Sequence, residues 1–171
     1  GKYYVHVGSM TILKGTANLY ELIKKINGTR KIVIIGQPCD VKSEKIYKRL
    51  EGIENVVLKG RLDHSETLQL IANAQALIST SNYEGFPNIF LEAWAAGVPV
   101  ISLKVNPGNV INKYELGICC DGDLNKMKEC IELDKTAGID KKQLISYVSK
   151  YHDFDTASER FLSILKKDLT Q

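Results

Sequence analysis

The chain has 171 residues, of which 44% are hydrophobic and 25% charged, and its 23 basic and 20 acidic side chains leave a formal net charge of +3. This balance is typical of a globular domain with its own hydrophobic core and argues against a disordered chain. The charge is too small to indicate nucleic-acid binding, and no stretch approaches the ~20 apolar residues of a membrane span. The first residues carry no signal-peptide pattern, so we expect a cytoplasmic protein.

The chain contains four cysteines, and their spacing bears on metal binding and disulfides. They are Cys39, Cys119, Cys120 and Cys130. None forms a C-x-x-C pair of the kind that holds a tetrahedral metal ion. We therefore expect free thiols in a reducing compartment.

The first third of the chain alternates strand and helix patterns. Residues 3–7 predict a strand, which is followed by apolar side chains at helical spacing, namely Leu19, Leu22, Ile23 and Ile26. Residues 31–35 form a continuous apolar run closed by Gly36, which is typical of a buried parallel strand. A polar helix is expected over about 41–50, and a third strand over 56–58.

The same alternation continues to the end of the chain. Leu68, Ile71 and Ala72 mark a helix for which Ser65 is a plausible N-cap. Strands are expected at 76–79, 98–103 and 117–120, with a helix over about 88–96. The tail predicts a helix with one apolar face, capped by Asp155 or Thr156. That face consists of Ala157, Phe161, Ile164 and Leu165.

Six strands alternating with helices predict an α/β fold with a doubly wound, Rossmann-like parallel sheet, forming a single domain over residues 1–171. In such a sheet, ligands bind at the carboxyl ends of the strands. This rule selects three junctions: Gly8-Ser9, Gly60-Arg61 and the loop 80–88.

The densest signal follows the fourth strand and runs Glu84-Gly85-Phe86-Pro87-Asn88-Ile89-Phe90-Leu91-Glu92. A helix start suits a phosphate group because its N–H groups are unpaired and carry a partial positive charge. Asn88 is a good N-cap residue, and Glu92 then lies about one turn, roughly 5–6 Å, into the helix. A diphosphate at the helix start would leave Glu92 beside a ribose diol and Glu84 beside a sugar. Charged acceptors make strong hydrogen bonds to hydroxyl groups.

An isolated pair of glutamates at this spacing is usually an ordinary surface feature, but the flanking residues add weight. The segment resembles the E-x7-E signature of GT-B glycosyltransferases and is most similar to the retaining enzymes of glycosyltransferase family 4. Other blocks match in the family's order: Val7-Gly8, Lys14-Gly15, Ile34-Ile35-Gly36, Leu58-Lys59-Gly60 and Gly97-Val98-Pro99-Val100-Ile101. The resemblance implies the C-terminal, donor-binding half of a GT-B fold, without the family's N-terminal acceptor domain.

The resemblance also implies roles for individual residues. Glu84 would contact the donor sugar, Glu92 the ribose, and Lys14 the diphosphate, so Glu84 and Lys14 are the candidate catalytic residues. The other implied donor-binding positions are Gly8, Ser9, Gly15, Gly60, Arg61, Phe86, Pro87, Asn88 and Ile89. Ser9 departs from the family's arginine, and Arg61 is a candidate to replace it.

The activity that the resemblance implies is retaining transfer of a hexose from a UDP- or GDP-sugar to a glycan or lipid-linked acceptor. Neither a cofactor nor a divalent metal is expected. Surface polysaccharide synthesis at the inner face of the membrane, with peripheral membrane association of the full enzyme, is a further implication. The acceptor would bind through the N-terminal domain, so we expect the isolated donor domain to bind weakly and to be inactive.

Other polar residues favour structural roles. Asp121-Gly122-Asp123 resembles the metal-binding D-x-D of other glycosyltransferases, but aspartates beside a helix start are ordinary caps. His6 is expected to pack within a strand, and Trp94 within a helix. His64 is expected before a helix cap, and His152 in a late polar turn. The segment 106–109 is either a simple turn or a loop near the donor.

Three other functions compete with this interpretation. A GT-B-fold nucleotide-sugar epimerase or phosphorylase would share the architecture. A non-catalytic nucleotide-sugar-binding subunit is favoured by Ser9 in place of arginine. A dinucleotide-dependent oxidoreductase would need G-x-G-x-x-G after the first strand, which residues 8–13 lack.

Overall fold

The computed structural model describes residues 3–26, 28 and 30–152, so the predicted tail helix with its caps lies outside them. The strands are β1 (Tyr4–Val7), β2 (Ile32–Ile35), β3 (Val56–Gly60), β4 (Ala76–Ser79), β5 (Val100–Ser102) and β6 (Gly117–Cys119). The α-helices are α1 (Thr16–Ile26), α2 (Val41–Leu50), α3 (His64–Ala72), α4 (Asn88–Ala95), α5 (Val110–Lys113), α6 (Leu124–Glu132) and α7 (Lys141–Tyr151), and a short 3-10 helix, η1, spans Pro107–Asn109.

The strands form one parallel sheet in the order β3-β2-β1-β4-β5-β6, which confirms the predicted doubly wound fold. The strand order reverses between β1 and β4. β1 pairs with β2 along four residues but with β4 along only two, Tyr4 and Val5. Beyond Val5 the two central strands are no longer paired, and such a reversal is where open α/β sheets bind ligands.

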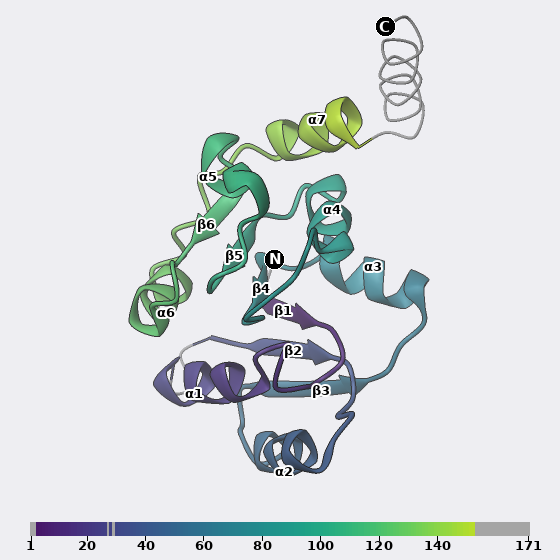
Figure 1. The fold of residues 1–171 in the computed structure, drawn as a ribbon, viewed down its shortest axis with the longest axis vertical. Helices are drawn as coiled ribbons and strands as arrows, with labels where there is room; N and C mark the ends of the chain where they lie inside the picture. Colours follow the sequence, from purple (N-terminus) through teal and green to yellow (C-terminus); the bar gives the residue numbers. More distant parts are fainter. Residues whose placement is uncertain (1–2, 27, 29, 153–171) are drawn as a thin grey trace, which may run out of the picture.

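Helices cover both faces of the sheet (Figure 1). Alternate strand residues point to opposite sides, and the apolar residues on each side are buried under helices in a core of their own. Tyr4, Ile32 and Ile78 pack with α1, α2 and α6 in one core. Val5, Val33 and Leu77 pack in a second core with α3, α4, α5 and α7. Both cores hold the two central strands rigidly from either side, which fixes the position of the loops that follow β1 and β4.

The predicted N-caps of two helices are wrong. α3 begins after Asp63 instead of Ser65, because Asp63 accepts from Glu66 N at 2.7 Å and completes a capping box. α4 has Pro87 at the N-cap, while Asn88 is the first helical residue and makes no capping hydrogen bond. Asn88 therefore leaves its side chain available for other contacts.

The carboxyl half of the chain also contains α7, a helix that the sequence analysis missed. His152, expected in a turn, is the C-cap of this helix. Trp94 of α4 is fully buried against Tyr147 of α7, at 5.5 Å between ring centroids, and its Nε1 donates to Leu116 O at 2.9 Å. These contacts confirm that Trp94 packs within the fold, and they anchor α4 against α7.

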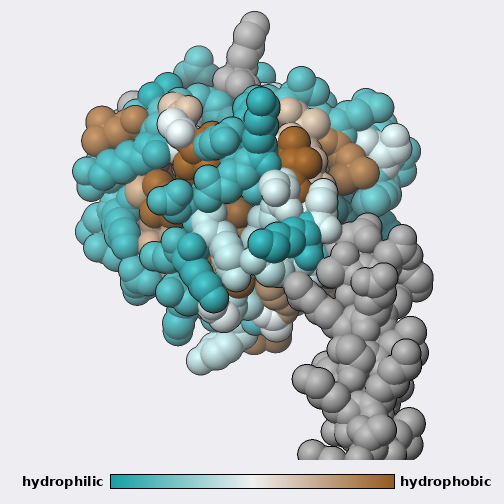
Figure 2. Space-filling model, turned by 90° about the horizontal axis from the view of Figure 1, so that it is seen from above, coloured by the Kyte–Doolittle hydropathy of each residue, from teal (hydrophilic) through white to brown (hydrophobic). Residues whose placement is uncertain are grey.

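The remaining general features are the state of the cysteines and the polarity of the surface. All four cysteines are free thiols, as predicted, and burial raises the pKa of Cys120 to about 12. Among the described residues, no helix is long and apolar enough to cross a membrane. The face seen in Figure 2 is mostly hydrophilic, with apolar side chains in separate small groups.

Candidate donor-binding site

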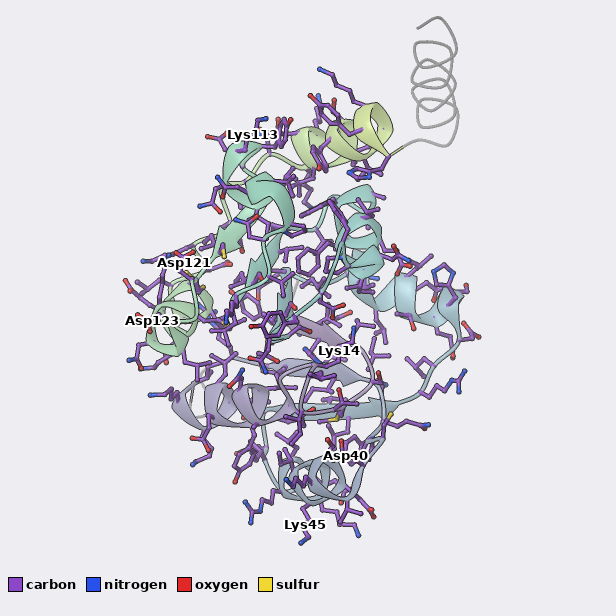
Figure 3. The ribbon with its side chains drawn as sticks, viewed as in Figure 1. Lys14, Asp40, Lys45, Lys113, Asp121 and Asp123 are labelled. Carbon is purple, nitrogen blue, oxygen red and sulfur yellow. The ribbon has the colours of Figure 1, made fainter. Side chains whose placement is uncertain are left out.

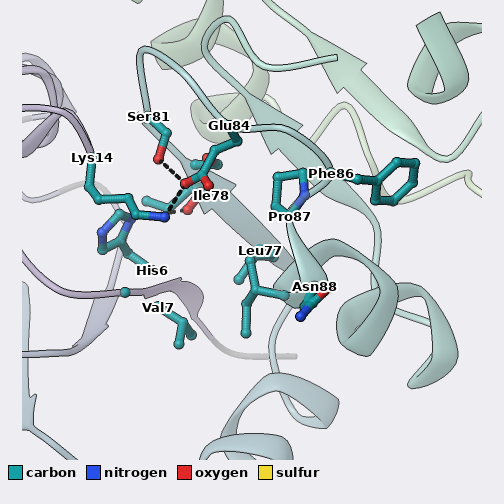
Figure 4. Close-up of a pocket in the computed structure, with 13 residues that line it drawn as sticks. His6, Val7, Lys14, Leu77, Ile78, Ser81, Glu84, Phe86, Pro87 and Asn88 are labelled. Atoms are coloured by element: carbon teal, nitrogen blue, oxygen red, sulfur yellow. Dashed lines mark hydrogen bonds and ion pairs between the residues drawn. The ribbon is translucent and has the colours of Figure 1, made fainter. Parts of the chain in front are cut away.

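A pocket of about 370 Å³ opens where β1 and β4 separate (Figure 4). It is lined by His6, Val7, Gly8, Lys14, Leu77, Ile78, Ser79, Ser81, Glu84, Phe86, Pro87, Asn88 and Ile89. Seven of the predicted site residues are among them: Gly8, Lys14, Glu84, Phe86, Pro87, Asn88 and Ile89. The structure thus brings the loop after β1 and the start of α4 to one cavity at the predicted edge of the sheet.

The loops after β1 and β4 are joined by hydrogen bonds to main-chain oxygen atoms. Thr80 Oγ1 donates to Gly15 O at 3.1 Å, and Asn82 N donates to Leu13 O at 3.1 Å. Gly15 has a φ of +70°, and a Cβ there would lie 1.8 Å from Thr80 O. Gly15 therefore does not line the pocket but allows the two loops to approach so closely.

Lys14 and Glu84 form an ion pair inside the pocket, with Lys14 Nζ 2.5 Å from Glu84 Oε1. Ser81 Oγ donates to the same carboxylate oxygen at 3.0 Å. The Glu84 side chain is 18% exposed and that of Lys14 is 39% exposed. The two candidate catalytic residues, 70 positions apart in the chain, are thus direct neighbours.

His6 lines the same pocket, a position that the sequence analysis missed. Its side chain is buried, as predicted for a strand residue, and Nδ1 lies 3.2 Å from Ile78 O. Burial lowers the pKa of His6 to about 4, against the opposing effect of the hydrogen bond to Ile78, so the ring is neutral near pH 7. The available signal was its place two residues before Gly8, at the carboxyl end of a central strand.

Glu92 does not line this pocket. It lies one turn into α4, and its Oε1 is 3.2 Å from Nε2 of His64, the first residue of α3. His64 therefore lies within the helix instead of ahead of its cap, and it supplies a partner for Glu92 that the sequence did not suggest. That Glu84 and Glu92 bracket one ligand remains a prediction.

The other predicted donor residues lie around the pocket or outside it. Ser9 and Arg61 are exposed and outside the pocket lining, and Gly60 O accepts a hydrogen bond from Gly36 N at 2.7 Å. The Phe86 ring points away from Lys14 and Glu84 in Figure 4 and lies 4.9 Å from the His152 ring. At Phe86, therefore, only part of the residue faces the cavity.

The D-x-D-like segment has a structural role. Asp123 caps α6 by accepting from Asn125 N and Lys126 N, and Asp121 pairs with Lys126 at 2.9 Å. Figure 3 shows both aspartates beside α6 and well apart from Lys14. Within the described part of the chain, no group of three or more histidine, cysteine or acidic side chains could hold a metal ion.

The segment 106–109 is a turn stabilised by its own side chains. Asn106 Oδ1 accepts from Ile111 N at 3.0 Å, and Asn106 Nδ2 donates to Asn109 Oδ1 at 3.0 Å. This confirms the turn interpretation, while an approach of this loop to a donor stays a prediction.

Comparison with known proteins identifies the family of this chain. The family model described as "Glycosyl transferases group 1" matches residues 1–147, and the chain belongs to this family. A lipopolysaccharide 1,6-galactosyltransferase from Salmonella typhimurium is 32% identical over 104 residues, covering 58% of this chain and 29% of the relative.

Solved structures share the fold. A mutant of TarM from S. aureus, in complex with Fondaparinux, α-GlcNAc-glycerol and UDP, superposes with a TM-score of 0.79 at 21% identity, covering 95% of this chain and 35% of that protein. HepE from Anabaena in complex with UDP gives a TM-score of 0.75 at 19% identity, covering 98% and 49%. The chain thus spans about a third to a half of the length of these structures.

Proposed function

We propose that the chain is the donor-binding half of a glycosyltransferase and binds a nucleotide-diphospho-sugar at the pocket between β1 and β4. The observation that carries the proposal is the Lys14–Glu84 pair facing this pocket beside the start of α4. The reaction would be metal-independent, retaining transfer of a hexose to a glycan or lipid-linked acceptor in surface polysaccharide synthesis, at the inner face of the membrane. A UDP-sugar is the favoured donor because two of the similar structures hold UDP.

The start of α4 and Lys14 together suit a diphosphate. Asn88 and Ile89 are the first two helical residues, so their N–H groups have no partner four residues earlier, and both residues line the pocket. The helix dipole adds a partial positive charge at the same place. Lys14 supplies a full charge on the opposite side, which would stabilise the diphosphate as it leaves.

The ion pair implies an exchange of partners on donor binding. In the free protein, Lys14 neutralises Glu84, so the pocket has little net charge. A diphosphate would compete for Lys14 and release Glu84, whose carboxylate could then accept hydrogen bonds from sugar hydroxyls. The partner exchange would couple recognition of the diphosphate to recognition of the sugar.

The length of one relative bears on the rest of the protein. The Salmonella relative is more than three times the length of the matched segment, which supports an acceptor-binding domain outside these residues. This half alone would then bind its donor weakly and transfer no sugar.

The epimerase and phosphorylase alternatives are less favoured, because the family model describes glycosyl transferases.

A non-catalytic nucleotide-sugar-binding subunit is the second candidate. It is favoured by Ser9, which is exposed and outside the pocket lining where the family has an arginine. In this form the domain would bind a donor without supporting its turnover. Hydrolysis of the donor by the full-length protein would separate an enzyme from such a subunit.

The proposal is tested by saturation-transfer NMR of this domain with UDP-, GDP- and ADP-sugars. We expect selective binding of one nucleotide class, weakened by Lys14→Ala and unchanged by Lys24→Ala, a matched lysine on the exposed face of α1 that pairs with Glu21. Equal binding of all three classes, or none at millimolar ligand, would contradict the proposal.

A further inference from the structure

The pocket floor contains a polar group to which none of the roles above gives a function, namely the imidazole of His6. His6 is 4% exposed and lies on β1, where this strand is still paired with β2 but no longer with β4. Figure 4 shows His6 at the same end of the pocket as the Lys14–Glu84–Ser81 cluster. A polar ring at this depth needs a hydrogen-bond partner for each nitrogen.

One nitrogen has such a partner, and this partner fixes the tautomer. Nδ1 lies 3.2 Å from Ile78 O, which as a carbonyl oxygen only accepts hydrogen bonds. Nδ1 must therefore carry the ring proton. Because the ring is neutral near pH 7, Nε2 has a free lone pair and acts as an acceptor.

The second nitrogen faces the cavity. Nε2 makes no hydrogen bond within the described part of the chain, yet it is not sealed in the core. Among the described residues, Thr136 Oγ1 is the one side-chain nitrogen or oxygen that is fully buried and has no hydrogen-bond partner. His6 Nε2 is not such an atom. Nε2 therefore keeps accessible surface, and the pocket is the cavity that His6 lines.

We propose that His6 Nε2 accepts a hydrogen bond from a hydroxyl group of the donor sugar and acts with Glu84 as a second sugar contact. This inference rests on the proposed function of the pocket. A bare lone pair repels a phosphate oxygen, which is also an acceptor, so the floor at His6 suits the sugar instead of the diphosphate. With Glu84 also an acceptor, this end of the pocket favours an uncharged hexose that presents hydroxyl groups over a sugar carboxylate.

Two substitutions separate the two nitrogens. In His6→Asn, the shorter amide lies near the position of Nδ1 and can still donate to Ile78 O, but the pocket-facing acceptor is lost. In His6→Gln, the longer amide reaches the position of Nε2 and restores an acceptor in the pocket. The measurement is the ratio of Kd for the nucleotide sugar to Kd for the bare nucleotide, using UDP-glucose, UDP-galactose and UDP, with GDP-mannose and GDP as the second pair.

We expect His6→Asn to raise this ratio about three- to ten-fold, the loss typical of one hydrogen bond, and His6→Gln to recover part of it. A ratio unchanged in His6→Asn, with nucleotide binding intact, would overturn the role of His6 and leave the donor site standing. If the unmodified protein binds none of these nucleotides, the proposed function fails and the inference with it.

A measurement on the unmodified protein removes any dependence on how the variants fold. Nitrogen-15 NMR of the His6 ring should show a protonated Nδ1 and a bare Nε2. Addition of the nucleotide sugar should shift the Nε2 resonance, while the bare nucleotide should leave it nearly unchanged. A protonated Nε2, or equal shifts with both ligands, would overturn the proposal.

Discussion

The two glutamates of the E-x7-E segment occupy different surroundings although they are one short segment of chain apart. Glu84, on the loop after β4, lies inside the pocket between Lys14 and Ser81. Glu92, on α4, lies outside it and pairs with His64, whose side chain is 71% exposed. One carboxylate is therefore paired with a lysine in a partly enclosed site, and the other with a histidine at the surface.

The contrast shows how position in the fold sets the strength of a charge. Surface ion pairs contribute little because water screens them and two side chains must be immobilised. A partly buried pair interacts in a lower effective dielectric, and removal of one partner leaves the other charge poorly solvated. The region around Glu84 should therefore respond strongly to mutation, and the region around Glu92 weakly.

Under the proposed function, the largest effect is expected from Lys14→Ala in a protein that carries this domain together with the proposed acceptor domain. Loss of the pocket cation should lower kcat/KM by about 100-fold or more, as for other groups that stabilise developing charge. The matched change His64→Ala at the Glu92 site should lower it by less than about threefold. Steady-state kinetics with the donor identified by NMR provides the measurement, and similar losses in both variants would contradict the contrast.

Acid stability should distinguish the histidine beneath Glu84 from the one beside Glu92. The pKa of His6 falls from 6.5 to about 4 on folding, so between these pH values the unfolded chain binds a proton that the folded chain does not. The free energy of unfolding should thus decrease as the pH falls through this window, by up to about 3 kcal/mol in total.

Urea unfolding between pH 7 and pH 4 measures this loss. In His6→Asn the contribution of this residue should be absent, so the pH dependence becomes shallower. His64→Gln, a change at the exposed histidine, is the matched control. The same slope in all three proteins would show that His6 is not the group responsible.

Ligand affinity should separate the two glutamates by the part of the donor they contact. Glu92→Gln should weaken UDP and UDP-sugar alike, by about three- to ten-fold, because both contain the ribose. Glu84→Gln should weaken UDP-sugar more than UDP. Isothermal titration of both ligands tests this, and an equal loss for both ligands in Glu84→Gln would remove its assignment to the sugar.

The smallest effect is expected in coupling energies. A double-mutant cycle of Lys14→Ala and Glu84→Ala should give a coupling above about 1 kcal/mol in the free energy of unfolding, while His64→Ala with Glu92→Ala should stay within the 0–1 kcal/mol of surface pairs. If the surface pair proved the more strongly coupled, the difference in burial would not explain the contrast.

Local patterns predicted much of the fold. The bounds of α2 and β4 agree with the structure, because an apolar run or a helical repeat is complete within each segment. The correct N-cap of α3 could also have been predicted from the sequence, since Asp63 precedes Glu66 by three residues as a capping box requires. α7 carries a similar signal, with Asp140 before apolar residues Leu144 and Tyr147 at helical spacing.

The remaining site features depend on contacts between distant segments. The pocket role of His6 requires the reversed strand order that brings β4 beside β1, with Ile78 72 residues away. The His64–Glu92 contact requires α3 to pack against α4. The pattern within a single strand or helix contains neither the His6–Ile78 contact nor the His64–Glu92 contact. Residue types and spacing could therefore identify the loop before α4 as a binding segment, but not which side chains lie next to it.

The tight approach of Gly15 to Thr80 O bears on how the pocket could be re-engineered. Next to the pocket the loops after β1 and β4 meet at this glycine, where an added methyl group would force them apart. Positions 86–89, by contrast, line the pocket from the loop before α4 and from its first turn. A mutant library selected for acceptance of a bulkier sugar should therefore return substitutions at positions 86–89 and an unaltered residue 15, so that new specificities arise from one side of the cavity.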